Sequence, residues 1–286
     1  MKHRRLEDTP PSERKNHIRQ GHFQYWQLLE GEDGSADNFS LQFVRLGDDF
    51  YSPRHRHNFE QIRIQVEGTF DFGRDGAMSP GTVGYFPEGV PYGPQTVASP
   101  GGGVLVLQFA GISGNGYLSE AMQDRGSAEL HARGAFRNGA FTRVEADGRR
   151  HNQDGFEAVW EHLMGRPISY PESAYEAPIM LRADDGAARD TAGKPGLHER
   201  ILGDFQAADV TIRNVTMAPG ATLAVAGPSI LVALSGEGQA EGQPWSRLTA
   251  MAVEPGETVT VAADAASEML VIRMPRLTAQ PLRATG

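Results

Sequence analysis

The sequence contains no cysteine among its 286 residues. This absence excludes disulfide frameworks, thiolate zinc sites, iron–sulfur clusters and a cysteine nucleophile. Any metal site must therefore use imidazole, carboxylate, amide or phenol ligands. Long apolar runs are missing too, because no stretch reaches the ~18 residues of a transmembrane helix. The basic start is followed by charged and polar residues, unlike a secretory signal. We therefore predict a cytoplasmic protein that does not enter a membrane.

An excess of positive charge is also missing. The chain has 27 Lys and Arg against 36 Asp and Glu, a net charge of −9, and its basic residues are scattered. Nucleic-acid binding needs a clustered basic surface, so it is not expected here. The one local cluster, Lys2 to Arg5, is interpreted as a solvated tail. With 39% hydrophobic residues, the chain is too apolar for general disorder and should fold.

Short apolar runs separated by single glycines and prolines dominate the rest of the chain, which has 34 Gly and 18 Pro. This pattern is typical of many short strands joined by tight turns. Spacings of about 8–12 residues favour a sandwich or barrel over alternating strands and helices. In the first half, strands are predicted at residues 40–47, 60–68, 69–73, 82–87 and 103–111.

The middle of the chain has a different pattern. Residues 117–133 and 152–164 carry apolar residues at helical intervals, for example Phe156, Val159 and Trp160, and we predict two surface helices. A second strand-rich block begins near residue 198 and repeats the rhythm of the first, which suggests two copies of one β unit. The predicted organisation is an arm at 1–37, a first β unit at 38–111, a helical and irregular connection at 112–197, and a second β unit at 198–286.

The most informative segment contains His55 and His57. Two histidines two residues apart on a strand point to the same face, where their imidazoles can share one metal. The same parity continues through Gln61, Arg63 and Gln65, whereas Glu60 faces the other way. On an unbulged strand, Gln61 is therefore the third ligand. A bulge would instead bring in Glu60 as a carboxylate ligand, and bulges are common beside active sites.

Two motifs resemble those of the cupin superfamily. The first is G-x7-H-x-H-x3-Q-x6-G, from Gly47 to Gly68, and the second is Gly81-x5-Pro87-x-Gly89-x2-Tyr92. The usual family forms are G-x5-H-x-H-x3,4-E-x6-G and G-x5-P-x-G-x2-H. The resemblance implies an all-β protein with two jelly-roll barrels and a partly helical connection. It covers residues 38–111 strongly and 198–277 weakly.

The resemblance also implies a metal site. His55 and His57 match the two histidine ligands, Gln61 stands where the family usually has Glu, and Tyr92 stands where the last His belongs. The implied cofactor is one divalent transition metal. Iron(II) is favoured, and manganese, nickel, copper and zinc are alternatives. Tyr92 is either a ligand, a proton donor in the pocket or an aromatic wall residue, and Glu60 is the candidate base.

The second β unit lacks equivalent ligands. The offsets that lead from Gly68 back to Gln61, His57 and His55 lead from Gly236 to the residues Ser229, Val225 and Leu223. We therefore expect a degenerate second barrel without a metal site.

The remaining site candidates are polar residues on strands of the first unit. Arg63 would orient a substrate anion through its planar guanidinium, or pair internally with Glu60 or Glu67. The other substrate-binding candidates are Gln65, Tyr85, Gln95 and Gln108.

The resemblance favours a dioxygenase acting on a small oxygen-rich molecule such as a diketone, enol or hydroxy acid. The alternative activity is that of a cupin isomerase, lyase or decarboxylase. A non-catalytic small-molecule-binding cupin and a metal-free acid–base enzyme are further alternatives. The expected partner is a small molecule, and the resemblance also favours a homodimer.

Overall fold

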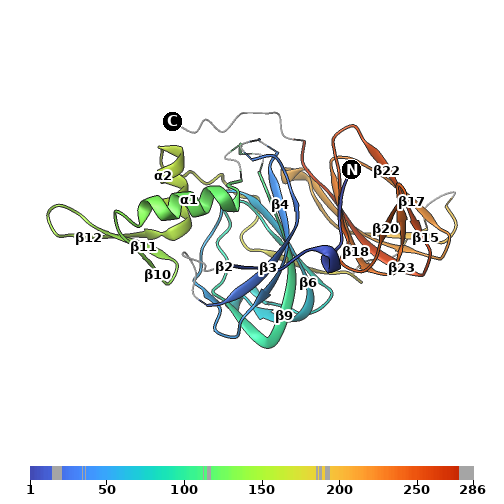
Figure 1. Cartoon of the computed structure of the whole chain (residues 1–286), viewed down its shortest axis with the longest axis horizontal. Helices are drawn as coiled ribbons and strands as arrows, with labels where there is room; N and C mark the ends of the chain where they lie inside the picture. Colours follow the sequence, from blue (N-terminus) through green and yellow to red (C-terminus); the bar gives the residue numbers. More distant parts are fainter. Residues whose placement is uncertain are drawn as a thin grey trace. The chain divides into compact units, whose positions relative to one another are not determined.

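The computed structural model describes residues 1–14, 21–33, 35, 37–111, 113–114, 117–184, 186, 189–190 and 194–276. Within these residues the chain consists mainly of antiparallel strands, with two α-helices (Figure 1). It divides into two compact units. The N-terminal unit comprises Pro11–Tyr25 and Glu30–Met180, and the C-terminal unit comprises Met1–Pro10, Trp26–Leu29 and Leu181–Arg276. The predicted all-β class with a helical connection is confirmed.

One large sheet forms the framework of the N-terminal unit. Its strands follow the order β13-β8-β6-β9-β4-β3-β2, and β5 and β7 pair with β9 and β6. The strands are β2 (Ser12–Arg14), β3 (Phe23–Glu30), β4 (Phe39–Leu46), β5 (Tyr51–Ser52), β6 (Glu60–Asp71), β7 (Ala77–Met78), β8 (Thr82–Phe86), β9 (Gln95–Phe109) and β13 (Ile179–Arg182). Three of these strands, β4, β6 and β8, begin within a residue of the predicted positions, because their apolar and polar residues alternate. The other two predicted strands differ: β9 begins at Gln95 and not at residue 103, and the strand expected at 69–73 is the continuation of β6.

The glycine that ends the first motif lies where β6 and β9 bend together. The register between the two strands shifts at Gln65/Glu67 and twice more before Phe70. Gly68 has φ +64 there, and a Cβ at this position would lie only 2.6 Å from the Cα of Gly102. A side chain at residue 68 would therefore need both a strained backbone and a wider strand separation.

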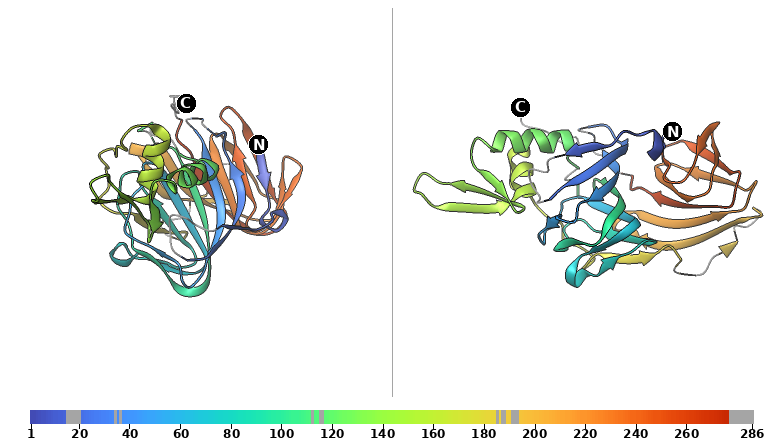
Figure 2. Two further views of the ribbon diagram at one scale, coloured as in Figure 1. Left: turned by 60° about the vertical axis from the view of Figure 1, so that its left-hand side comes forward. Right: turned by 60° about the horizontal axis from the view of Figure 1, so that its bottom comes forward.

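The helical connection folds around its own apolar cluster. It contains α1 (Glu120–Leu130), α2 (Gly155–Met164) and a sheet of β10 (Ala135–Arg137), β11 (Ala140–Val144) and β12 (Arg150–Asp154). Figure 2 shows these elements grouped together in one part of the unit. Most of α2 is buried, and Trp160 is fully covered, so α2 is a core helix and the prediction of a surface helix was wrong. Its tryptophan and phenylalanine pack on α1 and on Phe59.

An aspartate caps the start of α2. The side chain of Asp154 accepts hydrogen bonds from the backbone N–H groups of Phe156 (2.8 Å) and Glu157 (3.2 Å). We expect Asp154→Ala to lower the free energy of unfolding by about 1 kcal/mol, because these donors lose their acceptor. Urea unfolding followed by circular dichroism measures the change. Asp154→Asn keeps a capping oxygen and should lose much less. An equal loss in both variants would show that the cap is not the cause.

The C-terminal unit has two sheets, in the orders β1-β21-β18-β23-β16-β15-β14 and β17-β22-β19-β20. The strands are β1 (Lys2–Arg4), β14 (Arg189–Asp190), β15 (Leu197–Phe205), β16 (Val210–Met217), β17 (Thr222–Ala226), β18 (Ser229–Ser235), β19 (Gly238–Ala240), β20 (Gln243–Trp245), β21 (Ala250–Val253), β22 (Thr258–Ala263) and β23 (Ser267–Arg273). Three 3-10 turns, Leu6–Asp8, Gly73–Asp75 and Gln206–Ala208, complete the described elements of the chain.

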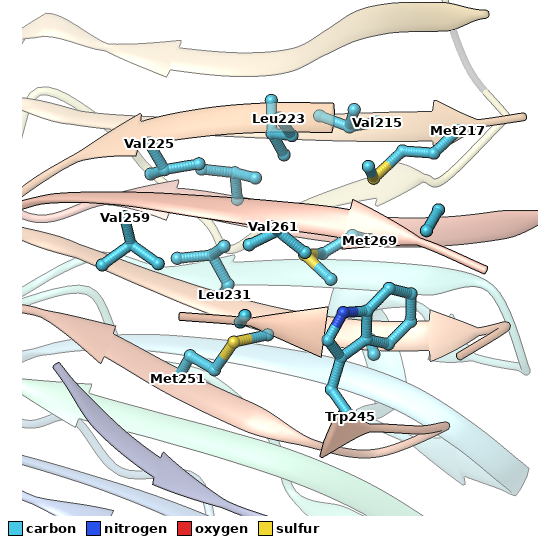
Figure 3. Close-up of a cluster of buried hydrophobic side chains, with 14 of the residues drawn as sticks. Val215, Met217, Leu223, Val225, Leu231, Trp245, Met251, Val259, Val261 and Met269 are labelled. Carbon is cyan, nitrogen blue, oxygen red and sulfur yellow. The ribbon is translucent and has the colours of Figure 1, made fainter. Parts of the chain in front are cut away.

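Apolar side chains fill the inside of the C-terminal unit (Figure 3). Leu223 and Val225, two of the positions that align with metal-ligand positions of the first unit, belong to this cluster. The third, Ser229, is buried and donates a hydrogen bond to the carbonyl of Ala226. A close-packed apolar interior offers no donor atoms to a metal or a polar substrate.

The first residues differ from the expected arm. Lys2–Arg4 forms β1, which pairs with β21 in the register His3↔Met251. The backbone of β21 has hydrogen-bonding groups to satisfy at this edge, and β1 covers them. A three-residue strand with charged side chains has no alternating apolar pattern, so the sequence indicated only a solvated tail.

Candidate functional site

A cavity of about 190 Å³ lies in the N-terminal unit. Side chains from β4, β5, β6 and β9 line it, together with residues of α1 and Phe156 of α2. Its volume is below the roughly 300–1,000 Å³ of sites for drug-sized ligands. The structure brings seven of the predicted site residues together around it: His55, His57, Gln61, Arg63, Tyr92, Gln95 and Gln108.

The two histidines face each other across a short distance. The backbones of His55 and Tyr92 form a two-bond bridge, N to O at 3.1 and 2.8 Å, which places both side chains on the cavity. His55 Nδ1 lies 2.6 Å from the carbonyl oxygen of Pro53, so this nitrogen carries the proton and Nε2 presents a lone pair. His55 Nε2 and His57 Nε2 are 3.1 Å apart.

Aromatic rings hold the second histidine in place. The ring of His57 stacks on Phe59 at 4.4 Å between centroids, and Phe156 of α2 meets it edge to face at 5.1 Å. The helical connection therefore takes part in shaping the site. Phe156 was predicted only as an apolar residue of a helix, because a contact between His57 and a residue almost a hundred positions later has no sequence signal.

Arg63 organises the polar wall. Its guanidinium donates to Gln61 Oε1 (2.6 Å), Gln95 Oε1 (2.7 Å) and the Tyr92 hydroxyl (3.2 Å). The rings of Phe86, Phe72 and Tyr92 lie about its guanidinium carbon at 4.9, 5.2 and 5.4 Å. Because a guanidinium stays protonated in proteins, this network puts a fixed positive charge beside the two histidines. The predicted internal pairing of Arg63 with Glu60 or Glu67 is not what the structure has. Glu67 instead pairs with Arg45.

The donor atoms fit a divalent metal. Two nitrogens 3.1 Å apart would subtend about 95° at a metal 2.1 Å from each, an ordinary angle for adjacent ligands. The Tyr92 hydroxyl lies 3.0 Å from His57 Nε2 and 3.4 Å from Gln61 Oε1, so all four predicted ligands converge. The carbonyl on His55 Nδ1 is the usual outer partner of a metal-bound imidazole.

This donor set carries no negative charge. Two imidazoles, an amide and a phenol are neutral, and Arg63 shares the oxygens of Gln61 and Tyr92. Among the described residues, no group of three His, Asp or Glu side chains is arranged to hold a metal. A metal here would therefore rest mainly on His55 and His57, and anions would balance its charge.

Glu60 does not reach the cavity, so its predicted roles as carboxylate ligand and base do not hold in this structure. The register of β6 and β9 is regular from Glu60↔Phe109 to Gln65↔Val104, and no bulge turns Glu60 inward. Its carboxylate instead accepts a hydrogen bond from the backbone N–H of Glu88 at 3.2 Å. Tyr85 pairs with Ile62, so it faces Glu60 on this opposite side and is not a substrate-binding residue.

Gln65 is also placed differently from its prediction. It is buried, and its amide donates to the backbone carbonyl of Glu67 at 2.7 Å, at the first β-bulge of β6. It does not belong to the cavity lining. Its amide satisfies backbone oxygens that the bulge takes out of the ladder, which is a structural role.

The buried Glu60 has an unusual pKa. Its pKa is raised to about 7. Burial is the largest cause and the nearby Glu88 carboxylate adds to it, while hydrogen bonds from Tyr85 and from the Glu88 backbone act in the opposite direction. Burial and Glu60 likewise raise the pKa of Tyr85 above its ordinary value. Glu60 and Tyr85 therefore lie together on the face of β6 that points away from the cavity.

This pKa predicts how stability depends on pH. The folded-state value is above the usual 4.5, so the stability that protonated Glu60 contributes is complete below pH 4.5 and is lost as the pH rises through 7. The free energy of unfolding that is lost in this way amounts to about 3 kcal/mol. The side chain in Glu60→Gln stays neutral at every pH. The free energy of unfolding of this variant, relative to that of the parent protein, should therefore rise by up to that amount between pH 4.5 and 8.

Urea unfolding at several pH values measures this difference. The surface variant Glu176→Gln is the control, because residue 176 is exposed. If the difference in free energy of unfolding between the parent and Glu60→Gln stays constant across this pH range, the prediction is wrong.

Sequence reasoning missed the contribution of α1. Glu120, Gln123, Asp124 and Ser127 all line the cavity. Their spacing of three, four and seven residues puts them on one face of the helix. That spacing is visible in the sequence. The position of α1 over the cavity could not be predicted, because most of the site lies on segments some sixty residues earlier.

Comparisons with known proteins agree on the fold. No family model matches the sequence, and no curated protein matches it. Among solved structures, a proposed dioxygenase from Nostoc punctiforme matches with a TM-score of 0.60 at 10% identity, over 98% of this chain and 85% of that one. Oxalate decarboxylase from Bacillus subtilis, which has Mn(II) centres, matches with a TM-score of 0.55 at 13% identity, over 99% and 79%.

These matches, together with the two motifs, define the class of protein: the chain has the bicupin fold. At 10–13% identity the likeness covers the fold alone. Among the described residues, no helix is long and apolar enough to cross a membrane.

Proposed function

We propose that this chain is a cupin enzyme that binds one divalent transition metal in its N-terminal unit and acts on a small, oxygen-rich organic anion. The observation that carries the proposal is the convergence of His55 Nε2 and His57 Nε2, 3.1 Å apart, with the charged Arg63 network on the same wall. His55 and His57 would hold the metal, with Gln61 and Tyr92 completing its ligands.

The side chains of this wall have distinct roles in the proposal. When bound, the metal supplies Lewis-acid or oxygen-binding chemistry. Arg63 binds the carboxylate or enolate of the substrate and fixes its orientation. Tyr92 holds a proton on its hydroxyl, 3.0 Å from His57 Nε2, where it can be donated to a substrate oxygen or exchanged with the imidazole. Phe59 and Phe156 keep water away from one side of His57.

The proposed reaction is that of a dioxygenase, and iron(II) is the favoured metal. Both choices rest on the family resemblance, because the carboxylate of the usual two-histidine, one-carboxylate iron(II) site is not among these ligands. Isomerase, lyase or decarboxylase activity with manganese, nickel, copper or zinc is the alternative. The fold relatives support this group of activities only by analogy. The proposed partner is a small molecule. The homodimer and the cytoplasmic location stay predictions.

Elemental analysis tests the metal site. The protein purified without added metal, and again after reconstitution, should contain close to one transition metal per chain. The double variant His55→Ala/His57→Ala should contain almost none. The matched control is His131→Ala/His151→Ala, which removes two exposed histidines outside the cavity and should keep the metal. No metal in the reconstituted parent protein would overturn the proposal.

A second function is favoured by a specific observation. Arg63 Nε lies 2.6 Å from Gln61 Oε1, so the position of the usual acidic ligand is already bonded to a cation. A metal-free enzyme would use His57 and Tyr92 as an acid–base pair, and a non-catalytic module would only bind the anion. Anion binding or turnover that survives a strong chelator would favour these readings.

A further inference from the structure

The polarity of the cavity changes along its strands. The register of β4, β6 and β9 stacks the inward side chains in layers. Gln61 lies opposite Gln108, and the next layer has Val106 between Arg63 and Gln42. In the layer after that, the two residues that line the cavity are Val104 and Val44. The wall therefore passes from amides, through a layer that holds the guanidinium of Arg63 and the amide of Gln42, to aliphatic side chains.

Aliphatic and aromatic residues continue the wall beyond Val104. Val44, Leu46 and Phe50 line the same cavity, and each is at most 9% exposed. They belong to one apolar cluster with Val104. Contact with this surface adds no binding free energy for a sugar or for a ligand that carries oxygen on every carbon. For a hydrocarbon, each methylene that the surface removes from water adds about 0.8 kcal/mol of binding free energy.

The opposite end of the cavity is polar and acidic. There α1 presents Glu120 and Asp124, and the hydroxyl of Tyr117, just before the helix, donates to Gln108 Oε1 at 3.2 Å. A carboxylate placed against this end would meet two like charges, and a hydrocarbon group would cover polar atoms. Only one orientation satisfies both ends: the anion on Arg63 and the hydrocarbon toward Val104 and Val44.

We propose that the ligand of this cavity is a small monocarboxylate with a hydrocarbon tail, its carboxylate on Arg63 and its tail against Val44, Leu46, Phe50 and Val104. The inference deepens the proposed function and rests on it in one respect, namely that this cavity is the substrate site. It names a class that the fold relatives do not: oxalate, the substrate in the name of one of them, has no hydrocarbon at all.

Calorimetric titration with the unbranched saturated carboxylates from acetate to octanoate tests the proposal on the full-length protein. The association constant should rise about three- to fourfold for each added methylene, which is the burial energy of one methylene expressed as a ratio. It should then fall once the chain exceeds the 190 Å³ cavity. Oxalate should bind no more tightly than acetate. Acetate binding as tightly as butyrate, or no binding by any member, would overturn the proposal.

A matched pair of variants locates the tail. Val44→Ala enlarges the apolar end, so the tightest ligand should become longer by about one carbon. Val83→Ala makes the same truncation on β8, at a buried position outside the cavity lining, and should leave the chain-length preference unchanged. If Val44→Ala does not fold, the titration series on the parent protein still decides. Equal preferences in the two folded variants would place the tail elsewhere and overturn the assignment.

The result is separable from the metal proposal. The series is run on the protein treated with chelator and on the reconstituted protein. A methylene gradient in both samples, with no metal held by the reconstituted protein, would support the hydrocarbon subsite and count against the metalloenzyme. A bound metal without a gradient would do the reverse.

Discussion

Arg63→Met is expected to weaken the binding of butyrate by at least about 30-fold. Removing one partner of a buried charged hydrogen-bonded pair costs about 2–5 kcal/mol in binding, which corresponds to a factor of about 30 or more. Methionine keeps an unbranched chain of similar length inside the ring of Phe86, Phe72 and Tyr92, so the cavity should keep its shape. The three oxygens that now accept from Arg63 would turn to the ligand or to water.

Two controls separate charge from packing. Arg63→Lys keeps the positive charge but not the planar fork, so its affinity should lie between those of the parent and Arg63→Met. Arg45→Met removes a half-exposed arginine on β4 that pairs with Glu67, and butyrate binding should not change. Calorimetry on variants with native circular dichroism gives the affinities. A value for Arg63→Met within twofold of the parent would show that Arg63 does not hold the anion.

Trp160→Ala should be the most destabilising single change in the helical connection. The side chain is completely buried, lies within the cluster that joins α1, α2 and Phe59, and has the guanidinium of Arg166 4.7 Å from its ring. Truncating such a residue removes its packing and leaves a cavity, which costs about 3–5 kcal/mol. Phe156 stands one helical turn before Trp160 and touches His57, so metal affinity should fall as well.

Trp160→Phe is the matched variant. The indole nitrogen of Trp160 has no hydrogen-bond partner among the described residues, so phenylalanine loses little besides volume. We expect a loss of under about 2 kcal/mol and nearly normal metal content. Urea unfolding measures both variants. A loss below 1 kcal/mol for Trp160→Ala would show that the cluster tolerates the cavity and that the helices are not essential to the unit.

The alternation of β6 could be read from the sequence because it is a local property. Side chains on an extended strand alternate between two faces, so the placement of Gln61 and Arg63 on one wall needed no knowledge of neighbouring strands. The predicted strand at the two histidines was wrong, because β6 begins only at Glu60: His55 forms an isolated bridge with Tyr92, and His57 lies in the irregular segment before β6. The motif glycine at residue 68 was likewise recognisable, and its positive φ at the bend explains its presence. The absence of ligand positions in the second unit was readable for the same reason, since Leu223 and Val225 are apolar in any register.

Other assignments depended on which strand lies beside which. The sequence predicted Tyr85 as a cavity residue, but its pairing with Ile62 places it on the opposite face of the sheet, with Glu60. Gln65 has the right parity, but the bulge that follows it uses its amide for backbone bonds. Neither fact follows from the residues alone, because strand register is set by contacts between segments far apart in the chain.

The amino-acid sequence by itself determined the all-β class, the two repeated units and the shared face of Gln61 and Arg63, because composition and period-two alternation act over a few residues. It also singled out His55 and His57, through the motif in which they stand. The tertiary structure alone decided that Glu60 stays out of the site, that α1 and Phe156 enter it, and that one end of the cavity is apolar. Those features arise where β4, β9 and the helices meet β6. Burial and register there depend on the packing of the whole unit, which no short stretch of sequence encodes.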